Sequence, residues 1–201
     1  MAAASGEILS RCPVTGLPIR TRPEWTDLDF GTNHYRVSLS VLGADTLLIR
    51  SEGESRLDNL KPYFAFYDRV VSEMFPPVGT HFAIEDFSAL NGTNRESRKF
   101  YLDWRRSDLR LKGVAFFGVT ELFRIMIKIG VRISRPRFPV KIARDYRAAV
   151  LWTHELAEVS GSEAPVSEVP AVVTPTLLPI QFDDFQMEFR ILDDEVLFQV
   201  S

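Results

Sequence analysis

The chain has 201 residues, of which 45% are hydrophobic and 25% are charged. These fractions are typical of a folded globular protein and exclude an intrinsically disordered one. No apolar run approaches the roughly 20 residues of a membrane-spanning helix, and the N-terminus lacks the basic start of a secretory signal. The single cysteine, Cys12, cannot form an internal disulfide, so we expect a cytoplasmic protein.

Charge is distributed unevenly along the chain. Residues 1–93 carry a net charge of −4, residues 94–150 a net charge of +10, and residues 151–201 a net charge of −9. Two explanations stay open: the acidic tail lies against the basic region of its own chain, or the basic region binds nucleic acid or another anion. We favour the first, because no nucleic-acid-binding motif accompanies the charge.

The first part of the chain predicts a lead-in segment and then a hairpin and a helix. Proline and glycine interrupt every period in residues 1–34, which predicts irregular structure. Residues 35–51 alternate apolar and polar side chains around a Gly43-Ala44 turn, as in a β-hairpin. Apolar residues at steps of three and four predict a helix over residues 57–74, with Asp58 as its cap.

Strands and helices then alternate. We expect strands over residues 81–87, 111–119 and 138–142, and helices over residues 94–107, 120–133 and 144–158. The order β-β-α-β-α-β-α-β-α implies a mostly parallel sheet with an antiparallel edge. An α/β domain is therefore predicted over residues 35–158, followed by a Pro-, Ser- and Glu-rich linker over residues 159–184.

Residues 185–201 return to the alternation of a hairpin. Placed 150 residues after the first hairpin without gaps, Phe185 falls on Tyr35, Leu197 on Leu47, and Asp193-Asp194 on the predicted turn. The segment is either the start of a second copy of the domain or an edge hairpin of the first.

The element order over residues 35–158 resembles the STAS fold of anti-sigma-factor antagonists. Four stretches are also similar to N-terminal modules of bacterial multidomain signalling proteins such as sensor histidine kinases: CPVTGLP (12–18), WTDLDFG (25–31), IEDFS (84–88) and FPVKIARDY (138–146). This resemblance implies a sensory or protein-interaction role within a larger bacterial regulatory protein.

STAS antagonists carry an Asp-Ser-Ser-Gly motif at the start of their second helix, where one serine is phosphorylated. Here the corresponding junction reads Asn91-Gly92-Thr93-Asn94, without the aspartate and the paired serines. Thr93 is the nearest match to the phospho-acceptor. The alternative, which we favour, is that Thr93 or Asn94 caps the helix.

Three residues near the predicted end of the strand over 81–87 form a candidate ligand site: Glu85, Asp86 and Ser88. Ligands collect at the carboxyl ends of parallel strands, and a carboxylate there could act as a general base in a small enzyme. No histidine, cysteine or second acid accompanies the pair, so we favour a turn or capping role for it.

The predicted helix over residues 120–133 is apolar around most of its circumference. Its basic residues Arg124, Lys128 and Arg132 form one narrow stripe, and Ile127 and Val131 lie at the edge of that stripe. The five residues form a candidate interaction surface, for the linker, the lead-in segment or a second subunit in a homodimer. A fit wholly within the domain is the alternative.

The sequence contains no pattern of metal ligands, no phosphate-binding loop and no nucleophile elbow. We therefore predict a non-catalytic signalling or interaction domain without a cofactor or metal. Its partner is expected to be another protein or a downstream domain of the same polypeptide. The small enzyme and a nucleic-acid-binding module on residues 94–150 remain alternatives.

Overall fold

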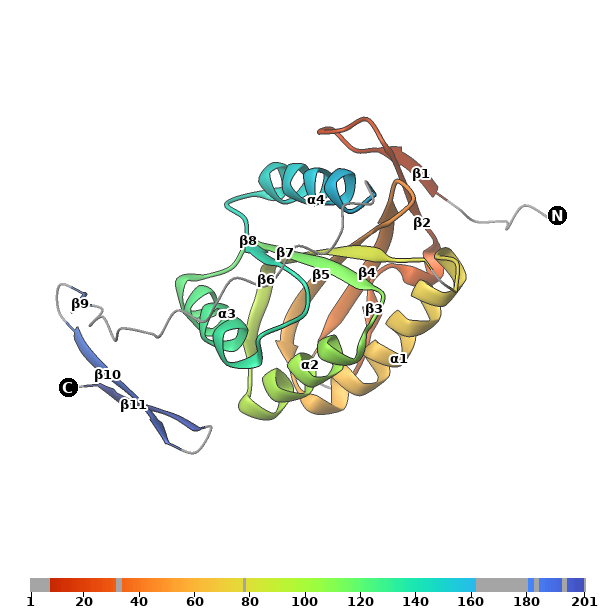
Figure 1. Cartoon of the computed structure of the whole chain (residues 1–201). Helices are drawn as coiled ribbons and strands as arrows, with labels where there is room; N and C mark the ends of the chain where they lie inside the picture. Colours follow the sequence, from red (N-terminus) through yellow and green to blue (C-terminus); the bar gives the residue numbers. More distant parts are fainter. Residues whose placement is uncertain are drawn as a thin grey trace. The chain divides into compact units, whose positions relative to one another are not determined.

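The computed structural model describes residues 8–31, 34–77, 79–161, 181–182, 185–192 and 195–200. The chain forms two compact units, which divide after Glu163 (Figure 1). The first unit is built on an eight-stranded sheet of order β1-β2-β4-β5-β6-β7-β8, with β3 paired to β4. These strands are β1 (Ile8–Arg11), β2 (Pro18–Thr21), β3 (Leu28–Asp29), β4 (Arg36–Leu42), β5 (Thr46–Ser55), β6 (His81–Thr93), β7 (Leu111–Phe117) and β8 (Val140–Ile142).

Strands β5 to β8 are parallel, and β1 to β5 pair antiparallel. Helices α1 (Leu57–Met74), α2 (Arg95–Ser107) and α3 (Glu121–Ser134) cover one face of the sheet, and α4 (Tyr146–Gly161) covers the other (Figure 1). From β4 to α4 the order is β-β-α-β-α-β-α-β-α. The predicted fold class is confirmed: the first unit has a STAS-like α/β fold.

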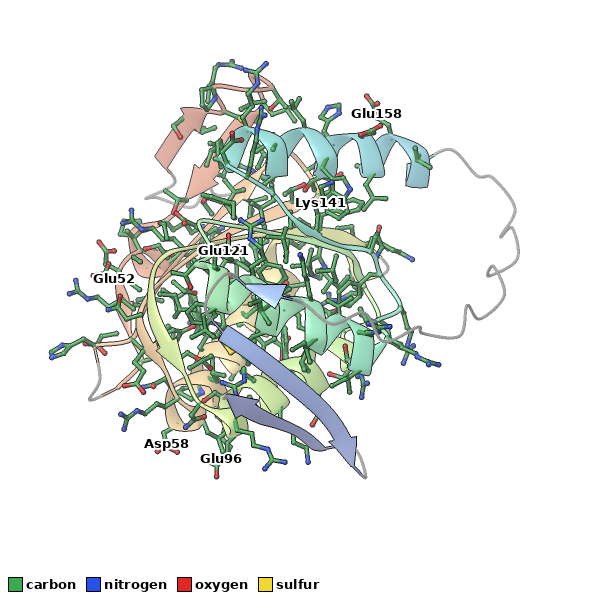
Figure 2. The ribbon with its side chains drawn as sticks, turned by 90° about the vertical axis from the view of Figure 1, so that its left-hand side faces the viewer. Glu52, Asp58, Glu96, Glu121, Lys141 and Glu158 are labelled. Atoms are coloured by element: carbon green, nitrogen blue, oxygen red, sulfur yellow. The ribbon has the colours of Figure 1, made fainter. Side chains whose placement is uncertain are left out.

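Helix α1 has the predicted bounds, Leu57–Met74, but not the predicted cap. Arg56 occupies the cap position, where its backbone N–H donates to Asn59 Oδ1 over 3.1 Å. Asp58 lies inside the first turn, where its negative charge interacts favourably with the positive end of the helix dipole. Glu96 has the same place in α2, and Figure 2 shows both carboxylates pointing outward at one end of the molecule.

Residues 8–29 of the predicted lead-in segment form three strands and a short helix, so the prediction of irregular structure was wrong for them. A hairpin joins β1 to β2 through Gly16, which has a φ of +71°, and β2 and β3 both pair with β4. Pro18 is tolerated because it is the first residue of β2. Trp25, on a short 3-10 helix (Pro23–Trp25), is buried in the core. The domain therefore begins before residue 35.

Strand β6 is longer than predicted, because it continues past Phe87 to Thr93. Two irregularities in its pairing with β5 allow this, one between Arg50 and Glu52 and one between Gly53 and Glu54. Gly53 has a φ of +88°, and a Cβ there would lie 2.5 Å from the His34 carbonyl oxygen. Only glycine fits this close approach.

The second unit contains β9 (Gln181–Phe182), β10 (Phe185–Leu192) and β11 (Glu195–Val200) in an antiparallel sheet. The predicted hairpin is confirmed, but the gapless repeat is not supported. Leu197 lies opposite Arg190, whereas Leu47 lies opposite Val41, so the two hairpins differ by one residue in register. A slip of one residue exchanges the two faces of a strand. Most of the predicted linker, residues 162–180, lies outside the described residues.

Within the described ranges, none of the helices combines the length and apolar character that spanning a bilayer requires.

Candidate functional site

Two neighbouring features lie between the sheet and helices α1 to α3. The first, the buried polar network, comprises Tyr67, His81, Glu85, Tyr101, Arg105 and Asp108. The second, the α2–α3 cavity, is lined mainly by residues of α2, α3, β6, β7 and β8. Tyr101 and Arg105 belong to both, because they line one wall of the cavity.

Glu85 and Arg105 form a buried ion pair at the centre of the network. Glu85 points from β6 towards α2, and both side chains are 3% exposed. The Tyr101 hydroxyl donates to the same Glu85 oxygen over 2.6 Å. Tyr101 and Arg105 are one helical turn apart on α2, so a single face of that helix supplies both donors to the carboxylate. The buried charge is thereby paired and hydrogen-bonded, as its burial requires.

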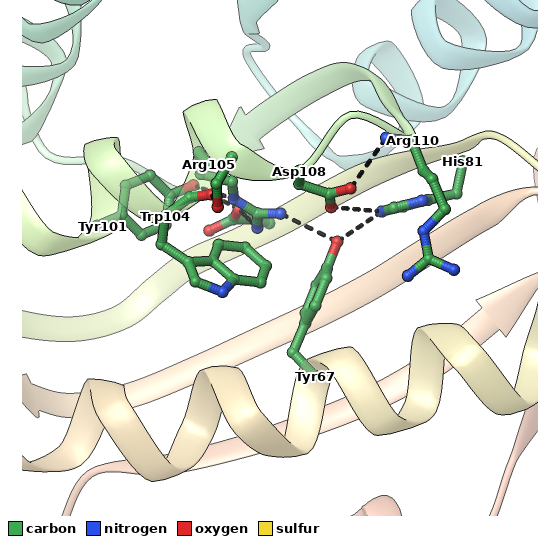
Figure 3. Close-up of polar contacts among 9 residues, drawn as sticks. Tyr67, His81, Tyr101, Trp104, Arg105, Asp108 and Arg110 are labelled. Carbon is green, nitrogen blue, oxygen red and sulfur yellow. Dashed lines mark hydrogen bonds and ion pairs between the residues drawn. The ribbon is translucent and has the colours of Figure 1, made fainter. Parts of the chain in front are cut away.

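The second half of the network connects α1 to the loop after α2 (Figure 3). Arg105 donates through Nη1 to the Tyr67 hydroxyl over 3.0 Å. His81 Nε2 lies 2.9 Å from that hydroxyl and 3.4 Å from Asp108 Oδ2. Asp108 also accepts the Arg110 backbone N–H over 3.1 Å. His81 Nδ1 has no partner, so we infer that the ring proton is on Nε2, between the two oxygens.

Burial controls the ionisation of the network. Desolvation raises the pKa of Tyr67 and that of Tyr101 above the ordinary tyrosine value, so both hydroxyls remain protonated. Burial would also raise the pKa of Asp108, but the hydrogen bond from His81 and the backbone N–H of Arg110 outweigh it and lower that pKa. The network is thus a cross-brace between α1, β6 and α2, and the charges at its centre, Glu85 and Arg105, are paired with each other.

The α2–α3 cavity has a volume of about 130 Å³ and is lined mainly by apolar side chains. They include Phe87, Leu90, Leu102, Val114, Phe116, Phe123, Met126, Ile127, Val131, Phe138 and Val140. Its polar lining residues include Ser55, Thr93, Ser97 and Arg98, where β5 and β6 end and α2 begins. This arrangement suits an apolar molecule with one polar end.

The structure does not bring Glu85, Asp86 and Ser88 together as one site. They lie within β6 and not at its end, so consecutive side chains point to opposite faces of the sheet. Glu85 is buried among helices, whereas Asp86 is half-buried on the α4 face and accepts the Ser88 backbone N–H over 2.9 Å. Ser88 is exposed, and its backbone packs closely against Gly118. A Cβ added at Gly118 would lie 2.6 Å from the Ser88 backbone nitrogen.

Asn94 occupies the cap position of α2, and its Oδ1 accepts the Ser97 backbone N–H over 2.8 Å. Thr93 is the last residue of β6 and pairs with Ser55 of β5. Its carbonyl oxygen accepts a hydrogen bond from Arg98 Nη1 over 3.0 Å. Thr93 thus lies at the polar end of the cavity.

The candidate interaction surface on α3 divides in two. Lys128 and Arg132 are exposed, and Arg124 is paired with Glu121 over 3.1 Å. Ile127 and Val131 are half-buried and line the cavity. The two apolar residues therefore face inward.

Sequence reasoning missed the network. The sequence pattern does not single out Arg105, which follows Tyr101 by one turn of α2 and is buried. His81 was read only as the start of a strand. The signal was a charged residue among the aromatic residues Phe100, Tyr101 and Trp104, but its partner Glu85 could be found only once the sheet was assembled. In the described part of the chain, no three potential metal ligands cluster.

No protein-family model matches the chain, and no curated protein matches it. In structure the chain is similar to an uncharacterized protein of the DUF3478 family, with a SpoIIAA-like fold, from Shewanella loihica PV-4. The two share 16% identity over 61% of this chain and 98% of that chain, with a TM-score of 0.49. The fold of this chain is STAS-like by its own element order and sheet topology.

Proposed function

We propose that the first unit is a non-catalytic sensory module. It binds a small, mainly apolar molecule in the α2–α3 cavity and passes the signal to a protein partner or to a further domain of its own polypeptide. The observation that carries the proposal is a preformed apolar cavity beside a network in which the buried carboxylate of Glu85 is paired with Arg105.

A binding role suits this geometry better than catalysis. A general base must reach the proton that it removes, but Glu85 is buried beneath Arg105 and Tyr101. The cavity is close in size to an engineered cavity of about 150 Å³ that binds benzene in another protein. Ligand in the cavity would contact α3 directly through Ile127 and Val131, and α3 presents Lys128 and Arg132 to the outside.

The proposal is tested by titrating a neutral apolar probe, indole, into the isotopically labelled protein and following amide and methyl NMR signals. We expect saturable shifts at residues around the cavity. The indole recovered after the titration should be chemically unmodified, because the proposed module is non-catalytic. Val131→Phe fills the cavity and should abolish the saturable shifts. Ile133→Phe is the matched control, because Ile133 on the same helix is 44% exposed, and it should bind like the wild type.

Absence of saturable binding to the wild type would overturn the proposal, as would equal binding by the Val131→Phe variant. Both variants are checked for native signals of the network before titration.

A further inference from the structure

The polar end of the cavity has a hydroxyl group without a partner. Ser97 is fully buried, and its Oγ makes no hydrogen bond in the structure. Its backbone N–H is already used by the cap, Asn94 Oδ1. Since buried hydroxyl groups are nearly always hydrogen-bonded, the free Oγ in the cavity lining indicates a missing partner with an oxygen or nitrogen atom.

The same end of the cavity carries positive charge from Arg98 and from the start of α2. Arg98 is half-buried in the cavity lining and is fixed by its hydrogen bond to the Thr93 carbonyl. Ser97 is in the first turn of α2, where the helix dipole is positive. Burial and then the neighbouring charge of Arg95 lower the pKa of Arg98, so a negative group beside it would be favourable.

The rest of the cavity favours a small, mainly apolar body. Its walls between α2 and α3 are mainly apolar, including Leu102, Met126 and Ile127, and its volume is about 130 Å³. Arg106 also lines the cavity, but its guanidinium already donates to the Ser134 carbonyl oxygen over 3.0 Å. A body of about six to eight carbon atoms fits such a space, by comparison with cavities that hold benzene. One small charged head with an apolar body satisfies both ends of the cavity.

We propose that the α2–α3 cavity is a binding site for a small monocarboxylate, whose carboxylate meets Ser97 and Arg98 and whose apolar body lies between α2 and α3. This inference rests on the proposed sensory function and names the class of its ligand. Benzoate and hexanoate are the probes.

The test compares benzoate with benzyl alcohol and benzylamine, and hexanoate with 1-hexanol, by calorimetry and NMR at pH 7. The carboxylates should bind at least about tenfold more tightly than the alcohols, which is the ratio expected for a charge-assisted hydrogen bond. The amine should bind most weakly. Ser97→Ala and Arg98→Gln should each weaken benzoate about tenfold while leaving benzyl alcohol within about twofold.

Lys99→Gln is the matched control, since Lys99 is exposed on the same helix, and benzoate affinity should be unchanged. Ser97→Ala should not lower the melting temperature without ligand, because it removes an unpartnered buried hydroxyl. This readout separates a missing contact from damage to the fold.

Equal affinities for acid and alcohol, or benzoate binding that is unaffected by Ser97→Ala and Arg98→Gln, would overturn the carboxylate inference while the sensory function stands. If indole does not bind, the sensory function fails, and if the carboxylates do not bind either, the carboxylate inference fails with it.

Discussion

Helices α1 and α3 lie on the same face of the sheet, and both are amphipathic, but they bury very different amounts of their surface. In α1, eight of 18 residues are buried, including Phe64, Tyr67 and Val70. In α3, only Phe123 and Ser134 of 14 residues are buried. The apolar side chains of α3 that face inward border the cavity, whereas those of α1 interlock with β4, β5 and β6 in the core cluster.

The difference teaches that the apolar face of a helix can serve two purposes. Close packing of α1 supplies stability, because each buried side chain fills its space and removes apolar surface from water. Helix α3 borders a cavity, so under the proposed function part of its stabilisation is expected to come from the bound ligand. Functional elements are commonly drawn from the less stable parts of a fold.

The largest effect is expected where α1 and α2 meet β6, in the buried polar network. Glu85→Gln leaves the buried guanidinium of Arg105 without its counter-ion and should lower the free energy of unfolding by about 3–5 kcal/mol. Urea denaturation measures the change. Glu73→Gln is the control: it breaks the more exposed Arg22–Glu73 pair and should cost less than about 1 kcal/mol. Similar losses in the two variants would contradict the role given to the network.

A matched pair of valines tests the comparison itself. Val70→Ala on α1 removes a fully buried side chain and should lower the free energy of unfolding by about 2–3 kcal/mol. Val131→Ala on α3 removes a half-buried side chain at the cavity and should cost less than about 1 kcal/mol. Equal costs in chemical denaturation would show that α3 packs as closely as α1 in solution.

Lowering the pH should destabilise the fold through protonation of Asp108 in the buried polar network. Because the native pKa of Asp108 is lowered, its ionised form stabilises the fold fully above the ordinary aspartate pKa of about 3.9, and the contribution is lost as pH falls through the native value. We expect Asp108→Asn to cost about 1–2 kcal/mol at pH 7. The gap from the wild type should shrink below about pH 4. A gap independent of pH from 7 to 3, measured by denaturation, would refute this prediction.

The smallest effect is expected at the start of α2, beside the cavity. Asn94→Ala removes the cap of the helix and should lower the free energy of unfolding by about 1 kcal/mol. Asn91→Ala, at an exposed position of β6, is the control and should change it by less than about 0.5 kcal/mol. An identical thermal transition for Asn94→Ala and the wild type would show that the Asn94 cap does not stabilise the protein.

The local pattern of the sequence predicted α1 from Leu57 to Met74 and the turn at Gly43, because periodicity and turn chemistry act over a few residues. It failed for β1 and β2, where Gly16 and Pro18 mark a hairpin that only pairing with β4 makes regular. It also ended β6 at Phe87, because the bulges that extend the strand depend on close approach to β5 and its neighbours.

The sequence by itself determined the order of strands and helices and the apolar faces, since backbone geometry gives strands and helices fixed periods. Only the tertiary structure decided which polar residues meet. Glu85 and Arg105 are 20 residues apart, Tyr67 and Arg105 are 38 apart, and their contacts exist because β6 brings its inward face beneath α1 and α2. The cavity has the same origin. How α3 packs on the sheet decides whether its inward side chains fill the space between them or leave a cavity.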